Sequence, residues 1–405
     1  MTMTAPATAL SAASRPRRIE SIDLLRGVVM ILMALDHVRD YFHRDAYLFD
    51  PTDMHQTNAP LFFTRWITHF CAPIFMLLAG VSARLYSLKK GTRAAAFFLL
   101  TRGLWLIFVE MFIVSVGWTF NIHFTFYILQ VIWAFGVSMI VLSALVRLPG
   151  SWQLTIAILL IGGHNLLDSI HVKGVGLPAV TWAFLHDQRP FFYSTFSFFM
   201  GYPILPWIGL ITLGFYLGRL YAPDFAPNRR KKILVRLGLA FIIGFILIRA
   251  IDYYGDPNPW TTQKNTVFTI LSFFNVTKYP PSLLYILMTI GPAFLFLAYT
   301  EKPLNSFTAK ITVFGRVPFF YYLIHIYLLH GLAIFAAMLQ GHPAADMVGF
   351  TNWVTANPQL KGYGFNLAFV YGLWIVVIVA LYPLCKWFDG YKRSNQAARP
   401  WLSYL

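Results

Sequence analysis

Long apolar stretches recur along the whole chain, and no polar interval between them is long enough for a separate soluble domain. A helix of about 17–25 residues crosses a hydrocarbon core of about 30 Å. Ten stretches of about that length lie at 22–42, 63–87, 95–117, 123–146, 152–168, 200–221, 235–253, 281–300, 317–339 and 364–386. Charged residues make up only 12% of the 405 residues, about half the share of a typical soluble protein. The sequence therefore predicts an all-α fold, a polytopic membrane helix bundle with about ten transmembrane helices.

The distribution of Lys and Arg predicts how this bundle is oriented, because these residues accumulate in loops that stay in the cytoplasm. If the basic cluster at 15–18 is inside, every cytoplasmic connection of the ten-helix scheme is basic. Both termini are then cytoplasmic, with a disordered tail at 1–17, a membrane domain at 18–390 and a second tail at 391–405. The net charge of +16 reflects this topology and contact with anionic headgroups of the lipid bilayer, so no nucleic acid partner is expected. We predict a multi-pass protein of the cell membrane.

The first span ends in the unusually polar sequence ALDHVRDYFH. An ionisable residue within a membrane is costly and is a functional-site hypothesis by default. Asp36, Asp40 and His43 follow helical spacing and share a face, and Asp36 can pair with Arg39 one turn away. A carboxylate beside an imidazole raises its basicity, as general-base chemistry requires, so we predict catalytic roles for Asp36, His37, Asp40 and His43. The competing interpretation is a simple ion pair at a helix end, with His37 as a packing residue.

Other spans place polar residues at a similar depth in the predicted outer half of the membrane. His69 lies one turn from Arg65 in TRWITHFCAP, Lys278 and Tyr279 precede the eighth span, and His325 lies near the middle of the ninth. The simplest way to house these residues is a titratable cavity that opens outward. We add His69 to the catalytic candidates and predict that five residues contact the substrate: Arg39, Arg65, Lys278, Tyr279 and His325.

The predicted inner ends of the helices are rich in arginine. Asp23 and Arg26 in SIDLLRG are spaced for an intrahelical pair, which is one interpretation of this motif. The other is that a phosphorylated ligand is held by arginines, which bind phosphate through two parallel hydrogen bonds; the candidates are Arg26, Arg102, Arg236 and Arg316. The chain has no glycine-rich nucleotide loop and no recurring ligand spacing for a metal, so no metal is expected. The role of Glu110, inside the third span, stays open.

The chain resembles bacterial relatives of the heparan-alpha-glucosaminide N-acetyltransferase catalytic domain, within the transmembrane acyltransferase superfamily. The resemblance covers about residues 18–390 and rests on five segments in this order: SIDLLRGVVMILMALDHVRDYF, TRWITHFCAPIFMLLAG, YPILPWIGLITLGFYLGR, KYPPSLLYILMTIGP and FGRVPFFYYLIHIYLLH. It implies that an acyl group, in the first instance acetyl, moves from cytoplasmic acyl-CoA (acetyl-CoA) to a sugar or glycan acceptor on the extracytoplasmic side, which in bacteria is the outer side of the inner membrane.

The resemblance also implies where the chemistry lies. In the lysosomal enzyme, a His just beyond the first helix acts with an Asn in that helix. Counted from the shared Arg-Gly, His37 falls at the position of the Asn, and His43 is the nearest counterpart of the His. The choice between His37 and His43 as the base is therefore open, and so is the choice between direct transfer and an acyl-histidine intermediate.

Two classes of function would use the same residues. In a CoA-dependent transmembrane acyltransferase, a His oriented by Asp36 or Asp40 removes the proton of the acceptor, and Arg39 or Lys278 stabilises the oxyanion. In a proton-coupled transporter, the Asp and His residues form a relay through the full thickness of the membrane. The polar residues are concentrated in the predicted outer half, which favours the enzyme. A homodimer is compatible with such a bundle, but no sequence feature requires one.

Overall fold

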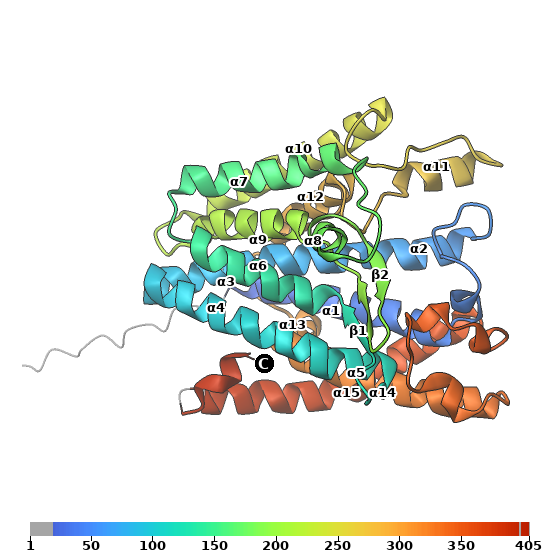
Figure 1. Ribbon diagram of the computed structural model, residues 1–405. Helices are drawn as coiled ribbons and strands as arrows, with labels where there is room; N and C mark the ends of the chain where they lie inside the picture. The colour runs from blue at the N-terminus through green and yellow to red at the C-terminus, as the bar shows by residue number, and fades with distance from the viewer. Residues whose placement is uncertain (1–18, 397, 405) are drawn as a thin grey trace, which may run out of the picture.

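The computed structural model describes residues 19–396 and 398–404, so the predicted tail at 1–17 lies outside the described residues. Most of its long helices lie along one common direction (Figure 1). The α-helices are α1 (Glu20–Phe42), α2 (Ala59–Ile67), α3 (Cys71–Lys90), α4 (Thr92–Val109), α5 (Ser115–Thr119), α6 (Val131–Leu145), α7 (Gly150–Gly162), α8 (Leu177–Leu185), α9 (Leu205–Leu217), α10 (Pro227–Ile251), α11 (Thr266–Phe274), α12 (Leu283–Tyr299), α13 (Ser306–Arg316), α14 (Pro318–Leu339) and α15 (Leu367–Asn395). Each of the ten predicted apolar stretches contains one of these helices.

Shorter helical turns join or extend these elements. They are η1 (Arg44–Tyr47), η2 (Thr68–Phe70), the π-helix η3 (Glu110–Val114), η4 (His164–Leu167), η5 (Gly218–Tyr221), η6 (Ala344–Met347), η7 (Val354–Ala356), η8 (Pro358–Leu360) and η9 (Pro400–Tyr404). Because η2 and η3 continue their flanking helices, the segments Ala59–Lys90 and Thr92–Thr119 each form one continuous helical segment.

Within the described ranges 19–396 and 398–404, five helical segments are long and apolar enough to cross a membrane. They are Ala59–Lys90, Thr92–Thr119, Pro227–Ile251, Pro318–Leu339 and Leu367–Asn395. Helices α6, α7 and α12 are apolar but shorter, and α1 has 23 residues but carries several charges. The predicted membrane bundle, mainly helical, is thus confirmed. The number of ten spans and the side on which each terminus lies stay predictions.

A small sheet is the main departure from the expected all-α fold. The stretch 123–146 was expected to be helical, but Phe126–Leu129 form strand β1 and α6 begins only at Val131. Strand β1 pairs in parallel with β3 (Ser197–Met200), which pairs antiparallel with β2 (Arg189–Phe192). Aromatic residues make up half of these strands and favour a pleated surface. The partner of β1 lies about seventy residues further along the chain, so local patterning could not reveal that pairing.

Helix α1 lies at the centre of the bundle, where it packs against α3, α12, α13, α14 and α15. Its end at Phe42 meets α2 and η2. The polar end of α1 is therefore surrounded by elements from distant parts of the sequence, which is the arrangement that a buried site requires.

Helices α3 and α9 approach each other closely at Gly80 and Gly214. A Cβ added to Gly214 would clash with the backbone of Leu77, and one added to Gly80 would clash with the backbone of Ile211. Backbone cannot move aside as a flexible side chain can, so only glycine fits at this crossing.

We expect Gly214→Ala to lower the free energy of unfolding by about 1–3 kcal/mol, the usual cost of forcing extra volume into packed structure. Thermal unfolding of the detergent-solubilised protein measures this change. Gly244→Ala is the matched control, because the atom nearest to its new Cβ is Leu287 Cδ1 at 3.7 Å. If both variants unfold at the wild-type temperature, α3 and α9 do not approach each other as closely as the structure shows.

Candidate functional site

A pocket of about 540 Å³ opens at the Phe42 end of α1. Its wall combines α1, the α2–η2 segment, the loop before α12 and the loop between α14 and α15. We call it the charged pocket, because charged side chains line it. Its lining includes seven of the predicted site residues: Asp36, His37, Arg39, Asp40, Arg65, Lys278 and Tyr279. The structure thus brings together most of the residues that the sequence placed in the outer half of the membrane.

Asp36 is the centre of an ion-pair network in this pocket. Arg39 Nη1 lies 2.7 Å from Asp36 Oδ1, which confirms the pair expected from the helical spacing. Arg65 Nη1 lies 2.6 Å from Asp36 Oδ2, and Lys278 Nζ lies 3.8 Å from the same oxygen. Arg39 also contacts Asp40, with Nη2 2.6 Å from Oδ1. Asp36 therefore compensates three cations that come from three separate segments of the chain.

His37 forms a chain of hydrogen bonds with His325 and the backbone of α14. His325 Nδ1 lies 2.8 Å from the Tyr321 carbonyl oxygen, which can only accept, so this nitrogen carries the hydrogen. In a neutral His325, Nε2 is then an acceptor, and His37 Nδ1, 2.7 Å away, donates to it. The hydrogen-bond network thus assigns the tautomer of His37. Its Nε2 keeps a free lone pair, and the ring lines the pocket.

This arrangement differs from the expected orientation of a His by Asp36 or Asp40. Among the described residues, both carboxylates pair with basic side chains, and no hydrogen bond joins either of them to His37. The orienting partner is instead His325, which the sequence suggested as a substrate contact. The two histidines are 288 positions apart, so helical spacing within α1 could not reveal their contact.

The structure does not bring His43 and His69 into the lining of the charged pocket. His43 ends α1, and its Nδ1 accepts the Asp45 backbone N–H at 3.3 Å. Burial lowers the pKa of the His43 imidazole. His69 is 3% exposed and packs against Tyr285, with the ring centroids 5.4 Å apart. Both imidazoles sit beside the pocket wall with local packing roles, which leaves His37 as the imidazole that faces the pocket.

Sequence reasoning missed the aromatic and amide residues of the charged pocket. Trp118 packs edge-on against His37 with centroids 4.9 Å apart, and Trp353 lies 5.2 Å from Trp118. Gln130, Gln188, Phe199, Tyr202 and Asn352 also line the pocket. Trp118 belongs to the short helix α5 and Phe199 to β3, and the others come from loops. Their positions depend on the tertiary fold.

Glu110, whose role the sequence left open, caps α6. Its Oε2 accepts the Trp133 backbone N–H at 2.8 Å, which satisfies one of the unpaired N–H groups at the start of a helix. Glu110 belongs to the π-helix η3. It therefore ties the Thr92–Thr119 segment to the beginning of α6, where residues of the pocket wall lie.

The predicted phosphate-binding arginines are only partly brought together. Arg26 Nη1 lies 3.3 Å from Asp23 Oδ1, and Arg26 Nη2 donates to Ser82 Oγ at 3.0 Å. Arg316 contacts Asp23 at 3.9 Å and Asp389 at 3.4 Å, which joins α13 and α15 to α1. Arg102 lies within electrostatic range of Arg26. Arg236, in contrast, is exposed on α10, which packs against α12.

No group of three or more His, Cys, Asp and Glu side chains that could hold a metal ion occurs within 19–396 and 398–404. The charged pocket itself presents the imidazole of His37 together with amides, carboxylates and cationic side chains.

Helices long enough to cross a membrane, with ionised side chains buried between them, define a multi-pass membrane protein with an internal polar site. The family model for the catalytic part of heparan-alpha-glucosaminide N-acetyltransferase matches residues 18–246. The chain belongs to this family, which confirms the resemblance seen in the sequence and supports a membrane acetyltransferase-like function. No curated relative matches the chain.

Proposed function

We propose that the protein transfers an acyl group, in the first instance acetyl, from acyl-CoA to a hydroxyl or amine of a sugar held in the charged pocket. The observation that carries this proposal is the chain from the Tyr321 carbonyl through His325 to His37. A base oriented by a second group is the usual device for activating a nucleophile. Here the free Nε2 of His37 faces the pocket in which the acceptor would bind.

The transfer follows from the chemistry of the residues. His37 Nε2 takes the proton of the acceptor while the acceptor oxygen or nitrogen attacks the thioester carbonyl carbon. The carbon–sulfur bond then breaks, and the CoA thiolate leaves and takes the proton back from the imidazolium. Arg39 pairs closely with both Asp36 and Asp40, at 2.7 and 2.6 Å, whereas Lys278 is held only loosely, 3.8 Å from Asp36. Lys278 is thus the cation best placed to stabilise the oxyanion.

The lining of the charged pocket suits a sugar acceptor. Aromatic faces such as those of Trp118, Trp353 and Tyr202 pack against the C–H face of a sugar ring, and amides such as Asn352 and Gln188 bind its hydroxyl groups. A few polar groups within a mainly apolar cavity are typical of small-molecule sites.

The donor is proposed to approach from the opposite end of α1. Arg26 and Arg316 lie there, and the ten residues from Arg26 to Asp36 span about 15 Å of helix. The phosphates of CoA would compete with Asp23 and Asp389 for these arginines. In this proposal the Arg26 end is cytoplasmic, the charged pocket is extracytoplasmic and the membrane is the bacterial inner membrane.

The test is a transfer assay with the full-length protein in lipid nanodiscs. Radiolabelled acetyl-CoA is added to a panel of amino sugars and neutral sugars, and labelled product is separated by chromatography. Transfer to at least one acceptor is expected, together with thermal stabilisation by CoA. Folded protein that transfers no label and is not stabilised by CoA overturns the proposal and favours the transporter alternative, for which CoA has no site.

A further inference from the structure

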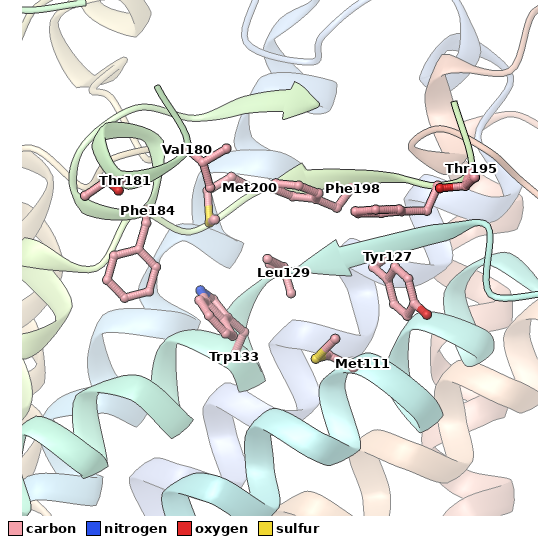
Figure 2. A pocket seen from close by; sticks show the side chains of 11 residues that line it. Met111, Tyr127, Leu129, Trp133, Val180, Thr181, Phe184, Thr195, Phe198 and Met200 are labelled. Carbon is pink, nitrogen blue, oxygen red and sulfur yellow. The ribbon is translucent and has the colours of Figure 1, made fainter. Parts of the chain in front are cut away.

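A second cavity, of about 740 Å³, lies beside the charged pocket. Its wall is formed by β1, β3, α8, the first turn of α6 and Met111 of η3 (Figure 2). Apolar side chains such as Leu129, Phe184, Phe198 and Met200 point into it. We call it the apolar pocket, and its size is within the range of about 300–1,000 Å³ usual for ligand sites.

The two pockets share a wall made by β1 and β3. Side chains of a strand point alternately to opposite faces, and along β3 Phe198 and Met200 line the apolar pocket while Phe199 lines the charged pocket. At the strand ends, Leu129 borders the apolar pocket and its neighbour Gln130 borders the charged one. A ligand that enters both pockets therefore has to cross only the end of a two-stranded wall.

Exposed aromatic side chains lie on the segments that border the apolar pocket. Phe108 and Phe112 belong to the Thr92–Thr119 segment, which is long and apolar enough to span the bilayer, and they are 49% and 39% exposed. On the hairpin between β2 and β3, Phe192 and Phe196 are 57% and 42% exposed. Aromatic side chains collect at membrane interfaces. The apolar pocket is thus within reach of lipid chains and not only of water.

Trp133 places a buried polar atom at this mainly apolar space. Trp133 Nε1 is buried and has no hydrogen-bond partner among the described residues, and Figure 2 shows its indole nitrogen directed toward the space below Met200. A buried donor without a partner is costly. An oxygen atom at the head of a hydrocarbon chain would satisfy it.

We propose that the acceptor is a lipid-linked sugar, with its hydrocarbon chain in the apolar pocket and its sugar in the charged pocket. This inference rests on the proposed function, because the charged pocket has to be the acceptor site. It follows from the shared wall, the apolar lining, the exposed aromatic surroundings and the single unpaired donor at Trp133. The lipid link also keeps the acceptor at the membrane, where the charged pocket opens.

The test uses a long-chain alkyl glucosaminide that carries a photoactivatable diazirine near the end of its chain. In nanodiscs, irradiation is expected to label peptides that contain Met111, Phe184 or Met200, identified by mass spectrometry. Val180→Trp fills part of the apolar pocket, so we expect at least tenfold less labelling. We also expect the kcat/KM for the alkyl glucosaminide, divided by that for methyl glucosaminide, to fall at least tenfold. Leu177→Trp is the matched control, because Leu177 is 79% exposed on the same helix and does not line the pocket.

The possible outcomes distinguish between the ligands that could occupy the apolar pocket. Labelling elsewhere, or a kcat/KM ratio that Val180→Trp does not change in a variant with wild-type thermal stability, overturns the proposal. Labelling of the pocket by a photoactivatable phospholipid that excess alkyl glucosaminide does not displace would mean that a structural lipid occupies it, which also overturns it. Failure of both glucosaminides to be acetylated, with pocket labelling intact, counts against the sugar acceptor of the proposed function and leaves a chain-binding site.

Discussion

His37→Gln is expected to lower kcat for acetyl transfer by about 10²–10⁴-fold, the range that a positioned general base contributes. The substituted amide keeps a similar volume and a polar end, but it cannot accept a proton at neutral pH. The fold should persist, because His37 contacts the rest of the site mainly through His325 and Trp118. Initial rates with radiolabelled acetyl-CoA, at saturating acceptor, measure the effect.

Two companion variants separate His37 from its neighbours. His325→Gln removes the ring nitrogen that accepts from His37 Nδ1, so it should lower kcat by less than His37→Gln and change its pH profile. His43→Gln removes only the acceptor for the Asp45 backbone N–H and should lower activity by less than tenfold. A larger loss in His43→Gln than in His37→Gln would show that His43 is the base and that His37 is not.

The sequence predicted the parts of this molecule that depend on local pattern. The length of each apolar stretch predicted a helix there, and the structure has one in each. The spacing of Asp36 and Arg39 on one helix predicted their ion pair. Ionised residues of separate spans were also expected to converge, because each would be too costly if it faced lipid alone. Arg65 and Lys278 do meet Asp36.

Features that depend on the relative rotation and depth of the helices could not be predicted in this way. The contact between His37 and His325 requires α1 and α14 to be placed within a fraction of a turn. Strand β1 was hidden within an apolar run, because four aromatic and aliphatic residues fit a helix as well as a strand. The cap that Glu110 provides for α6 joins two helices through backbone N–H groups, which carry no sequence signal.

The family match also divides the charged pocket. Residues 18–246 supply Asp36, His37 and Arg65, whereas Lys278, Tyr279 and Trp353 lie beyond the matched region. His37 and the carboxylates Asp36 and Asp40 thus belong to the part of the chain that the family model describes, whereas His325 does not. The loops before α12 and after α14 form the remaining wall, so we expect them to determine which acceptor fits while the base stays the same.

Asp36→Asn is expected to destabilise the protein by about 3–5 kcal/mol, the usual cost of removing one partner of a buried ion pair. Arg65 and Lys278 would lose their partner, and Arg39 would keep only Asp40. Arg39 is 2% exposed, so water cannot replace the lost carboxylate. Thermal or denaturant unfolding of the protein in detergent micelles measures this loss of stability. We expect the loss both in the presence and in the absence of ligand.

A double variant shows whether uncompensated charge causes the destabilisation of Asp36→Asn. Asp36→Asn combined with Arg65→Gln removes one of the uncompensated cations, so it should be more stable than Asp36→Asn alone, and the coupling energy of the cycle measures the pair. Asp45→Asn is the control at the same end of α1, because Asp45 faces the exposed Arg44 at 3.8 Å and such pairs contribute about 0–1 kcal/mol. If Asp36→Asn is no less stable than Asp45→Asn, Asp36 does not hold the cations together. The charged pocket would then need another anion to stay folded, and among its lining residues Asp40 and Asp50 are the candidates.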